Sequence, residues 1–303
     1  MFEALVQRLE PHGTLRRAWA LQGGVSAQVT ALEIERAEGQ IFKRVVRQHG
    51  AADLRKNPRI AGDEFRLLQI LYSADIPVPK PYDFDESGQI LPTPYLVIEF
   101  IDGQTEFGPT QLQDALAQMA MTLAKIHRVD VTSLEVSFLP DQAKMWVEKL
   151  ARRPILLDES LSEGRIRAAL QAAWPLPNRN PPALLHGDFW PGNLLWQEDR
   201  LVAVIDWEDA ALGEPLSDLA NSRLEILWAF GLEAMQAFTQ GYQAAMPALD
   251  FADLPYWDLC AALKPAHKLS DWGLSPAQER IMRERHAVFV TQALSKLKLH
   301  TGE

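Results

Sequence analysis

Residues 185–195 read Leu-His-Gly-Asp-Phe-Trp-Pro-Gly-Asn-Leu-Leu, and this stretch is the most informative part of the chain. Asp188 is followed five residues later by Asn193, and thirteen residues further on an apolar run ends in Asp206. The Pro-Gly pair between the Asp and the Asn predicts a loop, because neither residue suits a helix interior or a central strand. Residues 194–205 read as a hairpin. Such a hairpin would return the chain so that Asp206 lies close to Asn193.

An Asp, an Asn and a second Asp in this order are the parts that a kinase-type site needs. A general base must reach the acceptor hydroxyl, while metal ligands must face the phosphates. Mg²⁺ prefers hard oxygen ligands, which Asn193 and Asp206 supply. Protein kinases use His-Arg-Asp-x-x-x-x-Asn for these roles, with the Asp as base and the Asn on a metal ion. Here the order is His-Gly-Asp-x-x-x-x-Asn, then Ile-Asp-Trp in place of Asp-Phe-Gly.

A single His-x-Asp is usually an ordinary turn, in which these residues would cap a helix or end a strand. The ordered combination of the two Asp residues and the Asn, with an apolar strand before each Asp, favours a catalytic site over an ordinary turn. The chain resembles the aminoglycoside phosphotransferase and choline kinase family of small-molecule kinases over about residues 18–222. The resemblance implies an α+β, bilobal, protein-kinase-like fold. A small antiparallel-sheet N-lobe at 1–100 would bind nucleotide, a hinge would lie at about 98–103, and 104–303 would form a larger, mainly helical, catalytic and substrate-binding C-lobe.

Hydrophobic periodicity agrees with such a division. Short apolar runs separated by turns predict three antiparallel strands within 14–47, and Glu38-Gly39-Gln40 reads as a hairpin turn. Apolar residues at helical spacing predict further helices. The expected helices are 60–73, 110–128, 141–173, 216–245 and 276–298, and the remaining expected strand is 95–101.

The resemblance also implies nucleotide-binding residues in the N-lobe. Gly24 and Ser26 would belong to a phosphate-covering loop. A cation from the third strand would contact the α- and β-phosphates and pair with a helix carboxylate. The sequence favours Arg47 as this cation, with Lys43 second and Glu64 as the partner; the backbones of Glu99 and Ile101 would meet the purine.

In the C-lobe, Asp188 would be the catalytic base, and His186 would hold its loop by hydrogen bonds. Asp218, after Ser217 as N-cap, resembles the residue that braces this loop in the family. His127 reads as a cap or surface residue at the end of its helix. Five residues are candidate acceptor contacts: Trp190, Glu208, His267, Asp271 and Trp272.

Composition and charge limit the kinds of partner and compartment that the chain suits. The net charge of −10 argues against a nucleic-acid partner, and residues 101–303 carry 18 basic and 27 acidic groups, which would favour a cationic acceptor. The chain contains no apolar run long enough for a membrane span, and its first residues lack the pattern of a secretory signal. Cys260 is the only cysteine, which excludes an internal disulfide and suits the cytoplasm.

The expected activity is therefore transfer of the γ-phosphate of ATP, with Mg²⁺, to a small-molecule hydroxyl. The sequence does not separate ATP from GTP, and it leaves the acceptor open among aminoglycosides, macrolides, choline-like amines, homoserine and sugars. Two other classes stay open: a pseudokinase that binds nucleotide without turnover, and a metal-dependent hydrolase built on His186, Asp188, Asp206 and Asp209.

Overall fold

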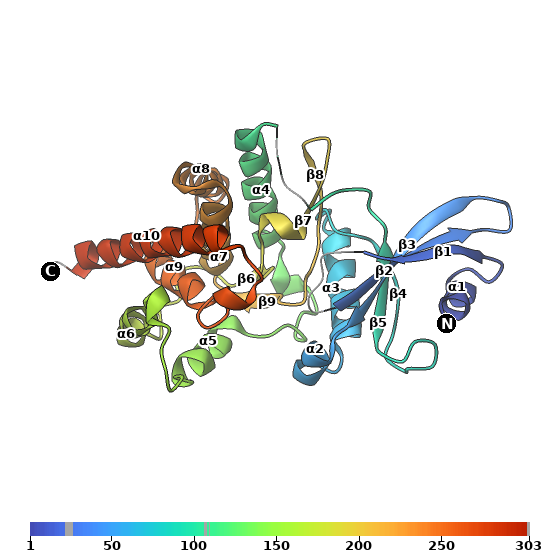
Figure 1. Ribbon diagram of the computed structural model, residues 1–303, viewed down its shortest axis with the longest axis horizontal. Helices are drawn as coiled ribbons and strands as arrows, with labels where there is room; N and C mark the ends of the chain where they lie inside the picture. Colours follow the sequence, from blue (N-terminus) through green and yellow to red (C-terminus); the bar gives the residue numbers. More distant parts are fainter. Residues whose placement is uncertain (22–26, 106–107, 109, 302–303) are drawn as a thin grey trace. The chain divides into compact units, whose positions relative to one another are not determined.

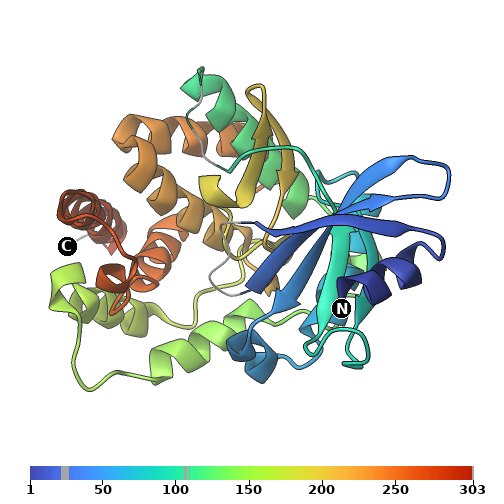
Figure 2. The same ribbon diagram turned by 45° about the vertical axis from the view of Figure 1, so that its right-hand side comes forward.

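The structure is a computed structural model that describes residues 1–21, 27–105, 108 and 110–301. The chain divides into two compact units, drawn in Figures 1 and 2. Unit 1 comprises Met1–Gly103 and Val202–Glu208, and unit 2 comprises Gln104–Leu201 and Asp209–Glu303. The expected division into 1–100 and 104–303 stays a prediction, to which the structure adds that 202–208 cluster with unit 1.

Unit 1 is built on a five-stranded sheet with the order β1-β2-β3-β5-β4, in which neighbouring strands are antiparallel. The three strands expected within 14–47 and the hairpin between the second and the third are confirmed. β4 begins at Pro81, and a proline is tolerated there because β4 is an edge strand. The strands are β1 (Thr14–Ala20), β2 (Ala27–Glu35), β3 (Ile41–His49), β4 (Pro81–Asp85) and β5 (Tyr95–Glu99).

Three helices accompany this sheet: α1 (Phe2–Leu9), α2 (Ala51–Lys56) and α3 (Ile60–Ser73). α3 has the expected bounds, and Figure 1 shows it (cyan) along one face of the sheet, where it packs against β4 and β5. α1 was not expected. Its apolar face joins a core of fully buried side chains from the helix, from β2, β3 and β5, and from the segment before β5, which includes Leu5, Leu32, Val46 and Tyr95.

Unit 2 is mainly helical. The helix expected at 141–173 is two helices, because the segment Arg153-Pro154 interrupts it, and the one expected at 216–245 is divided by Gly231, whose φ of +91° ends the first part. The helices are α4 (Leu112–His127), α5 (Gln142–Ala151), α6 (Glu163–Ala173), α7 (Pro215–Phe230), α8 (Leu232–Ala245), α9 (Leu254–Leu263) and α10 (Pro276–Thr301). Short 3₁₀ turns are η1 (Val131–Ser133), η2 (Glu159–Leu161), η3 (Pro191–Asn193) and η4 (Leu269–Asp271).

Two short sheets complete the fold. β6 (Ala183–Leu185) pairs with β9 (Ala211–Gly213), and β7 (Leu194–Gln197) pairs with β8 (Arg200–Val204) as the expected hairpin. α4 packs against α8, and α7 packs against both α8 and α9. None of the described helices is long and apolar enough to cross a membrane.

Candidate functional site

The loop of unit 2 that carries the His-Gly-Asp motif begins where β6 ends. Gly187 has a φ of +83°, and a Cβ built on it would lie 2.1 Å from the carbonyl oxygen of Asp209. Only glycine fits both restrictions. The expected loop ends in one 3₁₀ turn, η3, which begins at Pro191 because a proline is tolerated at the first position of such a turn.

Asp188 is held by two asparagines. The Asn193 amide nitrogen donates to the carbonyl oxygen of Asp188 at 2.9 Å and to its Oδ2 at 3.2 Å, and Asn221 of α7 donates to Oδ1 at 3.4 Å. Because the Asn193 nitrogen is committed to Asp188, its Oδ1 is left as the side-chain atom that can accept a proton donor or bind a cation.

Burial raises the pKa of Asp188, while Lys264 and His186 act in the opposite direction and Asp209 adds to the rise. The Lys264 ammonium group donates to the carbonyl oxygen of Gly187 at 2.8 Å, so it lies directly beside this loop. Glu225, one turn of α7 beyond Asn221, has a pKa raised to about 8, first by its burial and then by Asp188. Glu225 therefore carries a proton at neutral pH.

Asp218 braces the loop from α7, as expected. Its carboxylate, only 1% exposed, accepts the backbone N–H groups of His186 at 2.6 Å and of Gly187 at 3.0 Å. Burial alone would raise its pKa, but the hydrogen bonds, with that of His127 first, lower the pKa overall. The helix begins at Pro215, one residue before the expected 216, and its N-cap is Glu214, whose side chain accepts from Leu216, and not Ser217 as expected.

His127 is not the cap or surface residue that the sequence predicted. It is buried and not on the surface, with Nδ1 2.6 Å from the Tyr242 hydroxyl and Nε2 3.3 Å from Asp218 Oδ2. The ends of α4 and α8 thus support the aspartate that holds the loop. His186 contributes as expected, since its Nδ1 accepts the backbone N–H of Asp188 at 3.2 Å.

A second group of charged side chains lies within unit 1. Arg47 of β3 donates from Nη2 to Asp206 at 2.6 Å and to Glu208 at 2.5 Å, and its Nε is 3.6 Å from Glu64 of α3. Burial works against the charged guanidinium, but the three carboxylates more than compensate and raise the pKa of Arg47. Asp206 has a φ of +66°, a left-handed conformation that is uncommon outside glycine and typical of functional turns.

Lys43 lies elsewhere on the same strand. It is exposed and sits over the ring of Phe100, with 4.8 Å from its ammonium nitrogen to the ring centroid. Among the residues that the structure describes, Lys43 forms no ion pair. Arg47, and not Lys43, is therefore the strand cation that lies beside Glu64, although its contact with phosphate stays a prediction. Gly24 and Ser26 lie outside the described residues.

Of the two residues expected to meet the purine, Glu99 and Ile101, one has a backbone N–H group that is available to a base. The backbone N–H of Glu99 already donates to the Lys80 carbonyl at 2.8 Å, so it is not available to a base. The N–H of Ile101 has no backbone partner within the described part of the chain. Ile101 thus keeps the hydrogen-bonding capacity that the expected role requires.

The five acceptor candidates are scattered. Glu208 pairs with Arg47 in unit 1, beside Asp206. Trp190 is exposed within the loop, Trp272 packs edge-on against Trp228 of α7, and Asp271 is exposed. His267 bonds Glu163 of α6 at 2.8 Å and lines a separate pocket. Their contact with an acceptor stays a prediction.

Among the described residues, no group of three or more His, Cys, Asp and Glu side chains is arranged to hold a metal ion. The Asp206 carboxylate of unit 1 and the Asn193 amide of unit 2 each offer the hard oxygen that Mg²⁺ prefers, and their joint role at one ion stays a prediction.

Sequence reasoning missed Asn221, Glu225 and Lys264. Asn221 and Glu225 could have been predicted from the sequence, because they follow Asp218 at helical spacing and so lie on the helix face that Asp218 turns toward the loop. Lys264 lies 77 residues from Gly187 in the sequence, and no local pattern connects the two.

Unit 2 thus carries a carboxylate of raised pKa on a braced loop, and unit 1 carries an Arg-carboxylate cluster on its sheet. A family model described as the phosphotransferase enzyme family matches residues 19–252. The chain belongs to this family, which confirms the resemblance seen in its motifs.

Curated relatives extend well beyond this chain. Acyl-CoA dehydrogenase family member 11 of Homo sapiens is 26% identical over 207 residues, which cover 62% of this chain and 26% of that protein. Its counterpart in Rattus norvegicus is 30% identical over 185 residues, which cover 54% of this chain and 23% of that protein. The chain therefore spans about a quarter of the length of these relatives. Protein LicA of Haemophilus influenzae is 27% identical over 112 residues, or 36% of this chain and 40% of LicA.

Solved structures confirm the fold class. A protein from Ralstonia eutropha JMP134 assigned as an aminoglycoside phosphotransferase has a TM-score of 0.69 at 18% identity, covering 98% of this chain and 97% of that one. A thermostable mutant of aminoglycoside phosphotransferase APH(4)-Ia, in complex with AMP-PNP and hygromycin B, has a TM-score of 0.67 at 18% identity, covering 96% and 97%. At such identities the likeness shows the fold alone, which is the expected α+β, protein-kinase-like class.

Proposed function

We propose that this chain is an ATP- and Mg²⁺-dependent phosphotransferase that moves the γ-phosphate to a hydroxyl group of a small molecule. The observation that carries the proposal is the Asp188 carboxylate, which Asn193 and Asn221 hold and whose pKa is raised. A general base works best when its pKa approaches the pH at which it operates. Family membership and the nucleotide complexes of similar folds support the same reaction.

In the proposed reaction, Asp188 accepts the proton of the acceptor hydroxyl as the oxygen forms its bond to the γ-phosphorus. The bond between that phosphorus and the β–γ bridging oxygen breaks, and ADP leaves with the electron pair. Asn193 and Asn221 orient the carboxylate, and Asp218 fixes its loop through two backbone N–H groups. Such positioning is the main protein contribution to phosphoryl transfer.

We assign the phosphate contacts to Arg47, positioned by Glu64. The three carboxylates around this guanidinium hold it in place, and triphosphate oxygens would replace part of that shell. Asp206 and Asn193 would hold Mg²⁺, which neutralises phosphate charge when bound. The closeness of these two residues, the purine contact at Ile101 and the preference for ATP over GTP are parts of the proposal.

Two sets of acceptors follow from the relatives. The similar solved structures include enzymes bound to hygromycin B and to kanamycin. The curated relatives carry names that concern acyl-CoA compounds, although the chain spans only about a quarter of them. Hydroxyl-bearing compounds of both kinds therefore belong in an acceptor screen.

The test is ADP release and ³¹P NMR of products, with Mg·ATP and the acceptor panel. Asp188→Asn should lower turnover by about 10²–10⁴-fold, the usual contribution of a general base, while its affinity for Mg·ATP stays near that of the wild type. Asp114→Asn, which changes an exposed carboxylate of α4 that does not act on the pKa of Asp188, is the matched control. Turnover that is equal in Asp188→Asn and the wild type would remove Asp188 from this role.

A further inference from the structure

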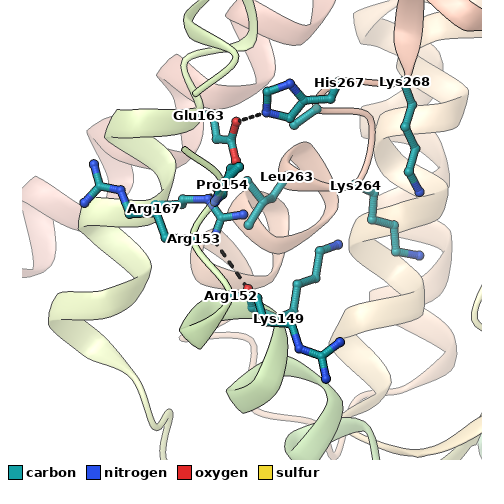
Figure 3. A pocket seen from close by; sticks show the side chains of 11 residues that line it. Lys149, Arg152, Arg153, Pro154, Glu163, Arg167, Leu263, Lys264, His267 and Lys268 are labelled. Atoms are coloured by element: carbon teal, nitrogen blue, oxygen red, sulfur yellow. Dashed lines mark hydrogen bonds and ion pairs between the residues drawn. The ribbon is translucent and has the colours of Figure 1, made fainter. Parts of the chain in front are cut away.

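Unit 2 contains a pocket of about 360 Å³ whose walls are rich in cations. We call it the basic pocket, and its cationic lining consists of Lys149, Arg152, Arg153, Arg167, Lys264 and Lys268. They come from the end of α5 and the segment after it, from α6, and from the segment that follows α9. Figure 3 shows Lys149 reaching from α5 toward the side where Lys264 and Lys268 lie.

The charge of the basic pocket is largely unbalanced. Glu163 is the one carboxylate among its lining residues, and it already accepts from Arg167 at 2.7 Å and from His267 at 2.8 Å. Within the described part of the chain, no carboxylate pairs with Lys149, Arg153, Lys264 or Lys268. Lys149, Arg153 and Lys268 thus line a common hollow without an ion-pair partner among the described residues, whereas the charge of Lys264 also acts on Asp188 and Glu225.

A simpler explanation accounts for part of this pattern. Lys149 lies in the last turn of α5 and Lys264 is the C-cap of α9, and cations are favoured at helix C-termini. That preference acts on each helix separately and does not require the side chains to converge. Their convergence has a cost: burial, followed by the charges of Lys264 and Lys268, lowers the pKa of Lys149 to about 8. An anion in the hollow would remove this repulsion.

The basic pocket adjoins the loop of the general base. Lys264 lines the pocket and at the same time donates to the carbonyl oxygen of Gly187, the residue before Asp188. A ligand that touches this lysine from the pocket is therefore separated from the Asp188 loop by one side chain. Both belong to unit 2.

We propose that the basic pocket binds a phosphate group carried by the acceptor substrate, so that the acceptor is a hydroxyl-bearing organic phosphate and not a cationic amine. The term acceptor rests on the proposed phosphotransferase function, whereas phosphate binding does not. A pocket of this volume is large enough for the phosphate-bearing part of a small organic molecule. The inference reverses the expectation drawn from the acidic excess of residues 101–303, because local charge at a pocket, and not the sum over a lobe, selects the ligand.

The test is a calorimetric titration with glycerol 3-phosphate, in the presence of saturating Mg·AMP-PNP, with glycerol as the uncharged match. The double variant Lys149→Gln/Lys268→Gln should weaken binding at least tenfold, because it removes two charge-assisted contacts. Lys144→Gln is the control, since it removes an exposed lysine of α5 that does not line the pocket. Equal affinities for the double variant and the wild type would overturn the proposal.

Two further measurements separate the outcomes. The pKa of Lys149, followed by NMR of its ε-carbon, should rise when glycerol 3-phosphate is added, and an unchanged pKa would contradict binding in this pocket. Binding that occurs only without AMP-PNP would assign the pocket to the nucleotide and overturn the acceptor role. In turnover assays the double variant should raise KM for phosphorylated acceptors only. If the chain has no phosphotransferase activity, the titration alone still decides whether the pocket binds phosphate.

Discussion

Removal of the Asp218 carboxylate is the perturbation for which the structure gives the clearest magnitude. In Asp218→Ala the backbone N–H groups of His186 and Gly187 lose their acceptor. Each unpaired buried donor costs about 1–3 kcal/mol, so the free energy of unfolding should fall by about 2–6 kcal/mol. Asp218→Asn keeps one accepting oxygen and should lose about half as much.

Urea denaturation followed by tryptophan fluorescence measures this change in the relevant unit, because seven of the nine tryptophans belong to unit 2. Asp114→Ala, which removes an exposed carboxylate from α4, is the control and should change the free energy by less than about 1 kcal/mol. A loss below about 1 kcal/mol in Asp218→Ala would refute the argument that this carboxylate carries the loop.

The same residue predicts a pH dependence. The pKa of Asp218 is lowered in the folded state, so its stabilising contribution is present above the unfolded pKa and is lost as the pH falls through the folded value. The difference in stability between wild type and Asp218→Asn should therefore be largest near neutral pH and shrink in acid. A difference that grows in acid would contradict the assigned direction.

Three other substitutions test separate contacts. Gly187→Ala should lower the melting temperature by several degrees, because a positive φ costs about 1–2 kcal/mol before the contact with Asp209 is counted; an unchanged scanning-calorimetry midpoint would argue against the close approach. Glu225→Gln should be more stable than the wild type at pH 9 but not at pH 5, because the raised pKa of about 8 means that the unfolded state releases this proton more readily than the folded state. Urea unfolding at both pH values measures the difference, and equal stabilities of variant and wild type at pH 9 would contradict the raised pKa. Arg47→Lys should raise the Kd for Mg·ATP at least tenfold in titration calorimetry, because one ammonium cannot replace the planar fork, and an unaltered Kd would exclude Arg47 from the phosphate contact.

Much of the fold was predictable from local patterns. The strands of unit 1, the helix α3 and the β7–β8 hairpin follow from alternation, helical spacing and turn residues. α9 was missed because nine of its ten residues are buried, which leaves no polar face to reveal a helical period. The end of α5 was also not predicted. The apolar spacing continues past Pro154, so periodicity alone does not show that the helix is interrupted there.

In the candidate site too, contacts within one short motif were predictable, whereas contacts between distant parts of the sequence were not. Asp188 and Asn193 belong to one short motif, and a five-residue loop spacing is enough to bring them together. Arg47 could be chosen over Lys43 only as a strand-end cation, and its contact with Glu208 depends on residues 161 positions apart. The basic pocket is built from α5, α6 and the segment after α9, so no single window of sequence contains its charge.

The most direct test of the central claim is thermal unfolding with Mg·ATP and Mg·GTP, for wild type and for Asp206→Asn. Asparagine keeps the size of the side chain and tolerates the left-handed backbone of this position, so the variant removes only the charge. At a hundredfold excess over Kd, bound nucleotide should add about 2.7 kcal/mol to the stability of the wild type and much less to that of Asp206→Asn. No shift with either nucleotide, or an equal shift in both proteins, would contradict the proposed metal–nucleotide site.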